Sequence, residues 1–204
     1  MKGLFITFEG IEGSGKTTMV RMLNEYLTDK GYQVIATYEP GDHPLGPDIR
    51  KLLLSPPVSP GLMGELLLYM ADRAEHLEKV IMPALKEGKI VLCDRFTDST
   101  LAYQGYARGG DIDTIKTLNK LVTGNLRPQR TYLLDLSPEE GLKRNSTAKK
   151  TDRFERESLE FHKRVREGFL QIASEEPERF KIIDSHKNLD EVFSEIKEDV
   201  EGLL

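Results

Sequence analysis

Apolar residues in this chain follow two spacings that alternate along the sequence. Short apolar runs of the kind found in buried strands lie at Leu4–Phe8, Gln33–Tyr38, Lys89–Cys93, Thr131–Leu136 and Phe180–Ile183. Between them, apolar residues recur at helical intervals in the segments Thr17–Asp29, Leu45–Leu54, Leu62–Lys86, Ile112–Val122, Phe154–Glu175 and Leu189–Leu203. We expect Pro83 to kink or end the longest helix, and SPPVSP at residues 55–60 to be a rigid loop.

The alternation of strands and helices predicts how these elements pack. Strands joined by helices form a parallel sheet with helices on both faces. The sequence therefore predicts an α/β fold in three layers, α/β/α, with a central, mainly parallel five-stranded sheet. A length of 204 residues suits one domain over residues 1–204. In such a sheet, ligands bind where the carboxyl ends of the strands meet.

Composition narrows the class of protein. Hydrophobic residues make up 38% and charged residues 31% of the chain, which is typical of a soluble globular protein. A net charge of −5 argues against a broad nucleic-acid-binding face. The single cysteine, Cys93, excludes an internal disulfide framework. We find no signal-peptide pattern and no apolar stretch of membrane-spanning length, so we expect a cytoplasmic protein with no membrane or nucleic-acid partner.

The first predicted strand leads into a glycine-rich motif. Residues Gly10, Ile11, Glu12, Gly13, Ser14, Gly15, Lys16 and Thr17 fit G-x-x-x-x-G-K-[ST], between a strand and a helix. Glycines let successive backbone N–H groups surround a phosphate, and the helix N-terminus adds a positive dipole end. We expect Lys16 to bridge the β- and γ-phosphates of ATP, Thr17 to ligate Mg²⁺, and Thr18 to complete the ATP site.

Several classes of phosphate-loop protein share this motif, and local sequence separates them. A GTPase normally carries N-K-x-D, whereas the stretch from Asn119 to Val122 lacks the aspartate. Motor and transporter ATPases are usually larger. A small kinase remains, which needs a second phosphate site.

Asp94 ends the third predicted strand, where it would act on Mg²⁺, and Arg95 follows where an acceptor phosphate would lie. Tyr69 and Arg73 share one helix face, offering a ring for a base beside a guanidinium.

Five segments in order resemble the bacterial thymidylate kinase family. They are FEGIEGSGKTT, Glu39-Pro40-Gly41, the stretch from Tyr69 to Arg73, DRFTDSTLAYQGYARG at residues 94–109, and Thr151-Asp152-Arg153-Phe154-Glu155. The resemblance runs from Leu4 to the C-terminal helix. It implies a P-loop kinase fold with a short lid at about residues 143–153, and direct in-line transfer of the ATP γ-phosphoryl group to dTMP with Mg²⁺, which supplies dTTP synthesis. It also implies a homodimer formed through the helical face.

The resemblance also implies roles for individual residues. Catalytic roles fall to Lys16, Arg95, Arg153 and Glu9. The acceptor nucleotide would contact Glu39, Pro40, Tyr69, Arg73, Arg95, Thr100, Tyr103 and Gln104. Within that set, Tyr69 would stack on thymine, Thr100 and Gln104 would lie at its edge, and Tyr103 would lie beneath the deoxyribose, where it disfavours a 2′-hydroxyl. Metal binding falls to Thr17 and Asp94.

The chain departs from the family pattern at two places. Where R-E-P-G-G is common, this chain has Tyr38-Glu39-Pro40-Gly41-Asp42. The phosphate loop has Glu12 in its middle and no arginine, which assigns charge neutralisation to the lid, but the lid lacks the usual cluster of arginines. Arg153 is our main candidate for the lid cation, with Arg144 nearer the donor base and Lys149 or Lys150 as substitutes.

Two alternatives stay open at this point. The chain could be a small kinase for deoxynucleosides or other monophosphates, or a nucleotide-gated switch in which ATP binding drives association. The acceptor-side block from Asp94 to Gly105 argues against the switch. Sequence does not separate dTMP from dUMP as the acceptor.

Overall fold

The core of the protein is a parallel sheet, and its strands lie close to where the apolar runs predict them. The computed structural model describes residues 3–55, 60–147 and 153–204. Its strands are β1 (Leu4–Glu9), β2 (Val34–Tyr38), β3 (Ile90–Asp94), β4 (Arg130–Asp135) and β5 (Phe180–Asp184). They pair in the order β2-β3-β1-β4-β5, and every pair is parallel. The predicted central sheet of five strands is therefore confirmed.

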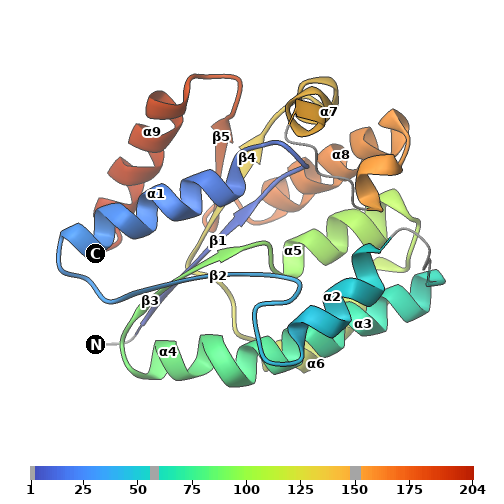
Figure 1. The fold of residues 1–204 in the computed structure, drawn as a ribbon, viewed down its shortest axis with the longest axis horizontal. Helices are drawn as coiled ribbons and strands as arrows, with labels where there is room; N and C mark the ends of the chain where they lie inside the picture. The colour runs from blue at the N-terminus through green and yellow to red at the C-terminus, as the bar shows by residue number, and fades with distance from the viewer. Residues whose placement is uncertain (1–2, 56–59, 148–152) are drawn as a thin grey trace.

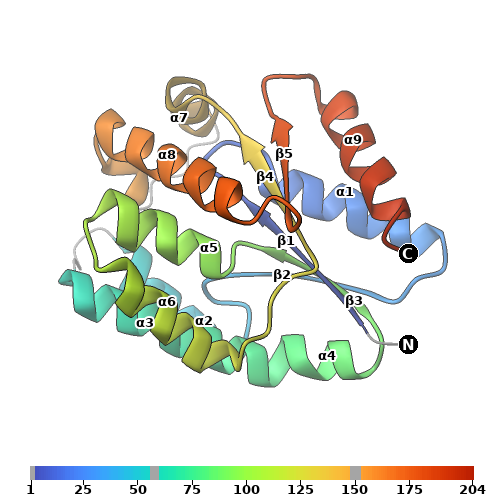
Figure 2. The ribbon, with the colours of Figure 1, turned by 180° about the vertical axis from the view of Figure 1, so that it is seen from behind.

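Helices cover both faces of this sheet. They are α1 (Lys16–Asp29), α2 (Gly46–Leu54), α3 (Leu62–His76), α4 (Met82–Lys86), α5 (Thr97–Thr100), α6 (Ile112–Thr123), α7 (Pro138–Thr147), α8 (Leu159–Glu175) and α9 (Leu189–Glu201). Figures 1 and 2 show α1 and α9 on one face, and α3, α4, α6 and α8 on the other. Successive residues of β4 face opposite layers, because Tyr132 and Leu134 pack with α1 and α9 while Leu133 packs with α8. The three-layer α/β/α prediction is confirmed.

The long helix differs in detail from its prediction. A π-helical segment, η1 (Leu77–Ile81), joins α3 to α4, so that the chain stays helical from Leu62 to Lys86. Pro83 lies in the first turn of α4, directly after this segment. Because a proline has no N–H to donate to the preceding turn, regular α-helical hydrogen bonding cannot continue through this position. The irregularity thus precedes the proline.

Two helical segments were missed because their apolar pattern is weak. The π-helix η2 (Leu101–Ala107) continues α5, and this stretch buries the polar side chains Asp98, Thr100 and Gln104. Buried polar residues hide the period on which sequence reasoning depends. Helix α7 is mostly polar, with Leu142 as its one large apolar residue.

The predicted helix Phe154–Glu175 is in two pieces. A 3₁₀ turn, η3 (Phe154–Arg156), precedes α8, and Ser158 caps α8 by accepting a hydrogen bond from the backbone N–H of Phe161. The loop predicted at residues 55–60 falls mostly outside the described residues. Across the described parts of the chain, no helix is long and apolar enough to cross a bilayer.

Candidate active site

The phosphate loop lies where β1 ends and α1 begins. Gly15 adopts the left-handed conformation (φ 97°) and caps α1, a conformation that costs little only without a Cβ. A Cβ on Gly13 would lie 2.3 Å from the carbonyl oxygen of Gly141 in α7, so this glycine lets α7 approach the loop. The sequence thus needs glycine at both positions to shape a cradle of backbone N–H groups.

Lys16 folds back into this cradle. Its Nζ donates hydrogen bonds to the carbonyl oxygens of Gly10 (3.0 Å) and Ile11 (2.8 Å). Burial, together with the positive charge of Arg95, lowers the pKa of Lys16 to about 8. Phosphate charge in the loop would favour the ammonium form, so the lysine is suited to bind a polyphosphate.

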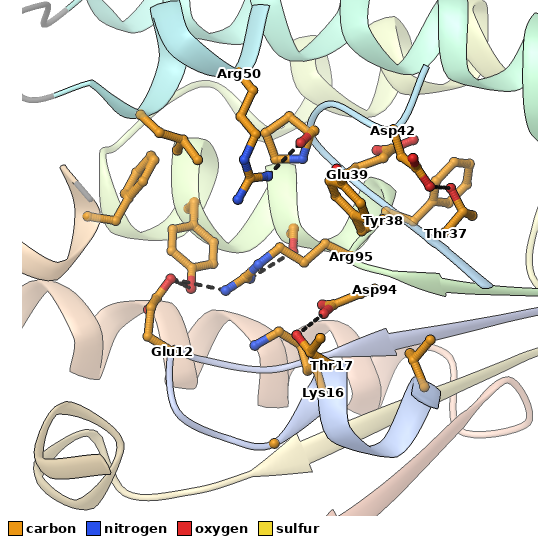
Figure 3. A pocket seen from close by; sticks show the side chains of 18 of the residues that line it. Glu12, Lys16, Thr17, Thr37, Tyr38, Glu39, Asp42, Arg50, Asp94 and Arg95 are labelled. Carbon is orange, nitrogen blue, oxygen red and sulfur yellow. Dashed lines mark hydrogen bonds and ion pairs between the residues drawn. The ribbon is translucent and has the colours of Figure 1, made fainter. Parts of the chain in front are cut away.

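Thr17, in the first turn of α1, and Asp94, at the end of β3, come together beside the phosphate loop. β3 pairs with β1 so that Asp94 lies opposite Phe8, beside the phosphate loop. The Thr17 hydroxyl donates a hydrogen bond of 2.6 Å to Asp94 Oδ2 (Figure 3). A hydroxyl and a carboxylate fit Mg²⁺, which usually takes one or two protein oxygens and completes its shell with phosphates and water. The donor set therefore fits the predicted ion.

Arg95 follows directly, in a strained backbone conformation. Its φ of 72° is left-handed, which is uncommon for a residue with a Cβ and is often found at functional sites. The guanidinium donates to the Gly10 carbonyl (3.2 Å) and to Glu12 (3.0 Å), and it lies over the Tyr103 ring at 5.0 Å. The strained turn thus aims the guanidinium at the phosphate loop rather than at solvent.

Glu12 links the loop to the groups on the acceptor side. It accepts hydrogen bonds from Arg95 and from the Tyr103 hydroxyl (2.6 Å), and its other oxygen lies 3.4 Å from His162 Nδ1. Burial alone would raise the pKa of Glu12, but the contact with His162 and the charges of Arg95 and Lys16 hold it well below its usual range. A charged Glu12 therefore fixes both Arg95 and Tyr103 in place.

Arg73 is buried under the acceptor side and donates hydrogen bonds to four protein groups. Its side chain is 1% exposed. Its side chain donates four hydrogen bonds, from Nε to Glu39, from Nη1 to Thr100 and Asn119, and from Nη2 to the Phe96 carbonyl, at distances between 2.8 and 3.1 Å. Nη2 also lies 2.8 Å from Glu39 Oε2 in an ion pair. Asn119, which the sequence offered as half of a GTPase motif, here holds an arginine.

Behind Arg73 lies a second layer of buried charge. Glu39 enters a cis peptide bond to Pro40, and its Oε1 contacts His76 Nδ1 at 3.0 Å. His76 Nε2 bonds the Thr37 hydroxyl at 2.6 Å. Burial raises the pKa of Glu39, but Arg73 and His76 outweigh this effect and lower it below its usual range. A neighbouring buried pair, His43 and Asp72, is 2.8 Å apart.

The phosphate loop and the acceptor-side residues open onto one cavity of about 1040 Å³. Its lining includes most of the predicted site residues: Glu12, Gly13, Gly15, Lys16, Thr17, Thr18, Glu39, Pro40, Tyr69, Arg73, Asp94, Arg95, Thr100, Tyr103, Gln104 and Arg144. Figure 3 shows Lys16, Thr17 and Asp94 on one side of Arg95, and Arg50 with the Glu39 loop on the other. The donor and acceptor sites inferred from distant segments thus open into one space.

Known proteins resemble this chain over its whole length. A family model described as thymidylate kinase matches residues 8–196. The thymidylate kinases of Halothermothrix orenii and Carboxydothermus hydrogenoformans are 50% and 51% identical, and each match covers 100% of this chain and 99% of the relative. The crystal structure of thymidylate kinase from Ehrlichia chaffeensis matches with a TM-score of 0.80 and 38% identity, covering 98% of this chain and 99% of that one.

The chain belongs to the thymidylate kinase family. The resemblance and the P-loop kinase fold predicted from the sequence are confirmed, and membership makes the chain an ATP-dependent nucleoside monophosphate kinase. Residue roles within the site remain predictions, and the geometry supports them unevenly.

Glu9 and Arg153 do not line the cavity as the structure describes it. Glu9 is fully buried, and its carboxylate accepts the backbone N–H groups of Phe96 (2.8 Å) and Ser99 (3.3 Å) at the start of α5. Burial and the charge of Asp98 raise the pKa of Glu9 to about 8. Glu9 therefore holds the start of α5 in place, and its catalytic role stays a prediction.

The lid residues are placed in part. Arg153 contacts Glu65, and its guanidinium lies 4.8 Å from the centre of the Phe154 ring. Arg144 lines the cavity and bonds the Ser185 carbonyl at 3.2 Å. Lys149 and Lys150 lie outside the described residues.

Sequence reasoning missed Arg50, which lines the same cavity. Its Nη1 donates to the Pro40 carbonyl at 2.6 Å, and its guanidinium lies 5.4 Å from the centre of the Tyr38 ring. The available signal was an arginine on the short helix that follows the Glu39-Pro40 loop. A second guanidinium therefore faces the space beside Arg95 (Figure 3).

Proposed function

We propose that the protein transfers the γ-phosphoryl group of ATP to dTMP, giving ADP and dTDP. One observation carries the proposal: the loop lysine and the acceptor-side arginine meet at a single oxygen. Lys16 Nζ and Arg95 Nη1 both donate to the Gly10 carbonyl, at 3.0 and 3.2 Å. A donor phosphate held by Lys16 and an acceptor phosphate held by Arg95 would therefore lie next to each other, as direct transfer requires.

The reaction needs positioning and charge neutralisation rather than a covalent intermediate. An oxygen of the acceptor phosphate attacks the γ-phosphorus of ATP while the bond to the bridging β–γ oxygen breaks, and ADP leaves with that oxygen. Arg95 and Arg50 would hold the acceptor phosphate, and Lys16 would neutralise charge on the donor. Thr17 and Asp94 would hold Mg²⁺, which supplies further neutralisation of the phosphates.

The acceptor nucleoside would bind between α3 and η2. Tyr69 offers a ring for the base, while Tyr103, fixed by Glu12, would lie under the sugar and leave no partner for a 2′-hydroxyl. Arg73 and Glu39 would support this pocket by holding Thr100, since their own polar groups bond one another. Among the lid cations, we keep Arg153 as the first candidate for the transition state, with Arg144 beside the donor.

A coupled assay of ADP release tests the proposal. The protein is assayed with ATP, Mg²⁺ and each of dTMP, dUMP, dCMP, dAMP, dGMP and UMP, with an acceptor-free sample as the control. We expect dTMP to give the highest kcat/KM and UMP far less than dUMP. Slow ATP hydrolysis that no monophosphate changes would contradict the proposal and favour the nucleotide-gated switch.

We further propose a cytoplasmic homodimer. Helices α2, α3 and α6 pack side by side, and they carry exposed large apolar residues: Leu52, Met63, Leu67 and Leu121. Leu121 is 76% exposed. A second copy covering this face would remove these side chains from water. Sedimentation equilibrium would show a dimer, and Leu121→Glu should shift it toward monomer, whereas a monomeric wild-type protein would refute the assembly.

A further inference from the structure

Gln104 is held in one orientation by a buried carboxylate on another helix. Its amide Nε2 donates a 2.6 Å hydrogen bond to Glu65 Oε1, and both residues are 1% exposed. Glu65 lies in the first turn of α3, where the helix dipole favours a negative charge. Two arginines anchor the same carboxylate: Arg108 Nε at 3.1 Å and Arg153 Nη2.

This arrangement settles which end of the amide faces the cavity. A carboxylate held by two guanidinium groups offers only acceptors, so the atom that faces Glu65 must be the amide nitrogen. Gln104 lines the main cavity, and within the described parts of the chain no donor contacts its Oε1. The side chain therefore presents a hydrogen-bond acceptor to any base that enters.

The neighbouring groups complete a pattern that a base can match. Arg73 donates hydrogen bonds to Glu39, Thr100, Asn119 and the Phe96 carbonyl. Thr100 accepts one of these bonds through Oγ1, and its hydroxyl proton has no acceptor among the described residues. The pocket thus offers an acceptor at Gln104 and a hydroxyl donor at Thr100.

A pyrimidine with a ring N–H beside a carbonyl complements this pair, as in thymine and uracil. A cytosine base instead presents a ring-nitrogen lone pair toward Gln104 Oε1, and two acceptors repel each other. A site built to hydrogen-bond one pattern rejects the other strongly, because its buried polar groups would be left unpaired.

We propose that Glu65 is a positioning residue which, by fixing the Gln104 amide, makes the acceptor site select bases with a ring N–H over cytosine. The inference rests on the proposed transfer to a pyrimidine monophosphate and adds the residue that sets its base preference. Glu65 itself does not line the cavity in the described structure and acts through Gln104.

The test is the ratio of kcat/KM for dTMP to kcat/KM for dCMP in Glu65→Gln. A glutamine at this position can donate as well as accept, so Gln104 can turn its amide around. We expect the ratio to fall at least about tenfold, the effect of roughly one hydrogen bond. Glu157→Gln is the matched control, because it removes the other carboxylate partner of Arg108 (2.7 Å) without touching Gln104, and it should leave the ratio unchanged.

A double-mutant cycle separates positioning from general damage to the fold. In Gln104→Met, which has no amide, adding Glu65→Gln should lower the ratio no further. If Glu65→Gln fails to fold, Glu65→Asp is the second variant. Its shorter side chain keeps the negative charge but moves the carboxylate away from the Gln104 amide, so we expect the same fall in the dTMP to dCMP ratio. Equal losses for dTMP and dCMP, or a further fall in the Gln104→Met background, would overturn the inference. A wild-type protein inactive with dTMP would instead refute the proposed function.

Discussion

Replacing Arg73 by methionine tests the claim that this arginine supports the pocket from below. The substitution keeps much of the apolar stem and removes the guanidinium. Glu39, which is 4% exposed, then loses its main charge partner, and Thr100 and Asn119 lose a donor. Leaving one member of a buried ion pair without its partner costs about 3–5 kcal/mol. That is a large share of the roughly 5–15 kcal/mol that stabilises a typical domain.

The free energy of unfolding can be measured in urea by far-UV circular dichroism, since the chain has no tryptophan. We expect Arg73→Met to lower it by about 3–5 kcal/mol at pH 7. Burial would then raise the pKa of Glu39, which Arg73 lowers in the wild type. Because the folded variant would bind a proton that the unfolded chain has lost, its deficit should shrink as the pH falls from 7 to 5.

Arg127→Met provides the control for this measurement. Arg127 is 74% exposed in its ion pair with Glu176, and such surface pairs contribute about 0–1 kcal/mol. If Arg73→Met costs no more than Arg127→Met, or costs the same at pH 5 as at pH 7, Glu39 and Arg73 do not form the buried pair on which this reasoning depends.

Three further predictions concern the catalytic assignments. Lys16→Ala should lower kcat by at least about 10²-fold with an unchanged circular dichroism spectrum, and a near-normal rate would contradict the phosphate-loop assignment. Because the folded-state pKa of Glu9 is raised to about 8, the free energy of unfolding of the wild type should fall by more than about 1 kcal/mol between pH 5 and pH 8. Glu9→Gln should remove this fall, and the same pH dependence of the free energy of unfolding in both proteins would contradict the assignment. Arg153→Ala should lower kcat about tenfold or more with little change in dTMP affinity, and the same pattern in Lys150→Ala instead would assign the lid cation to the lysine.

The centre of the sheet could be predicted because its three inner strands, β1, β3 and β4, are buried on both faces and read as continuous apolar runs. The same argument fails for α5 and η2, where the helix buries Thr100 and Gln104 to build the pocket. Polar residues placed inside for function have no period that marks them as buried. Hydrophobic pattern therefore located the frame, and motif spacing was needed to locate the site.

Motif spacing identified which residues gather but not what each one touches. Tyr69 and Arg73 do line one cavity, as four-residue spacing on a helix predicts. That spacing could not reveal that Glu39, 34 positions earlier in the chain, would form a buried ion pair with Arg73. Partners that come from distant segments depend on tertiary packing, which a single sequence does not display. The same reason explains why Arg50 and Glu65 were missed.

The departures from the family pattern in the Glu39 loop find their explanation in such partners. Tyr38 stands where an arginine is common, and its ring packs under the guanidinium of Arg50. Asp42 replaces a glycine and accepts a 2.7 Å hydrogen bond from Thr37, whose oxygen also bonds His76. Each new side chain thus engages a residue that supports the acceptor side: Tyr38 steadies an arginine that faces the cavity, and Asp42 extends the buried chain of hydrogen bonds that ends on Glu39. The exchange of a cation for an aromatic ring therefore leaves Arg50 and Arg95 facing the acceptor side of the cavity, each held by neutral or acidic partners.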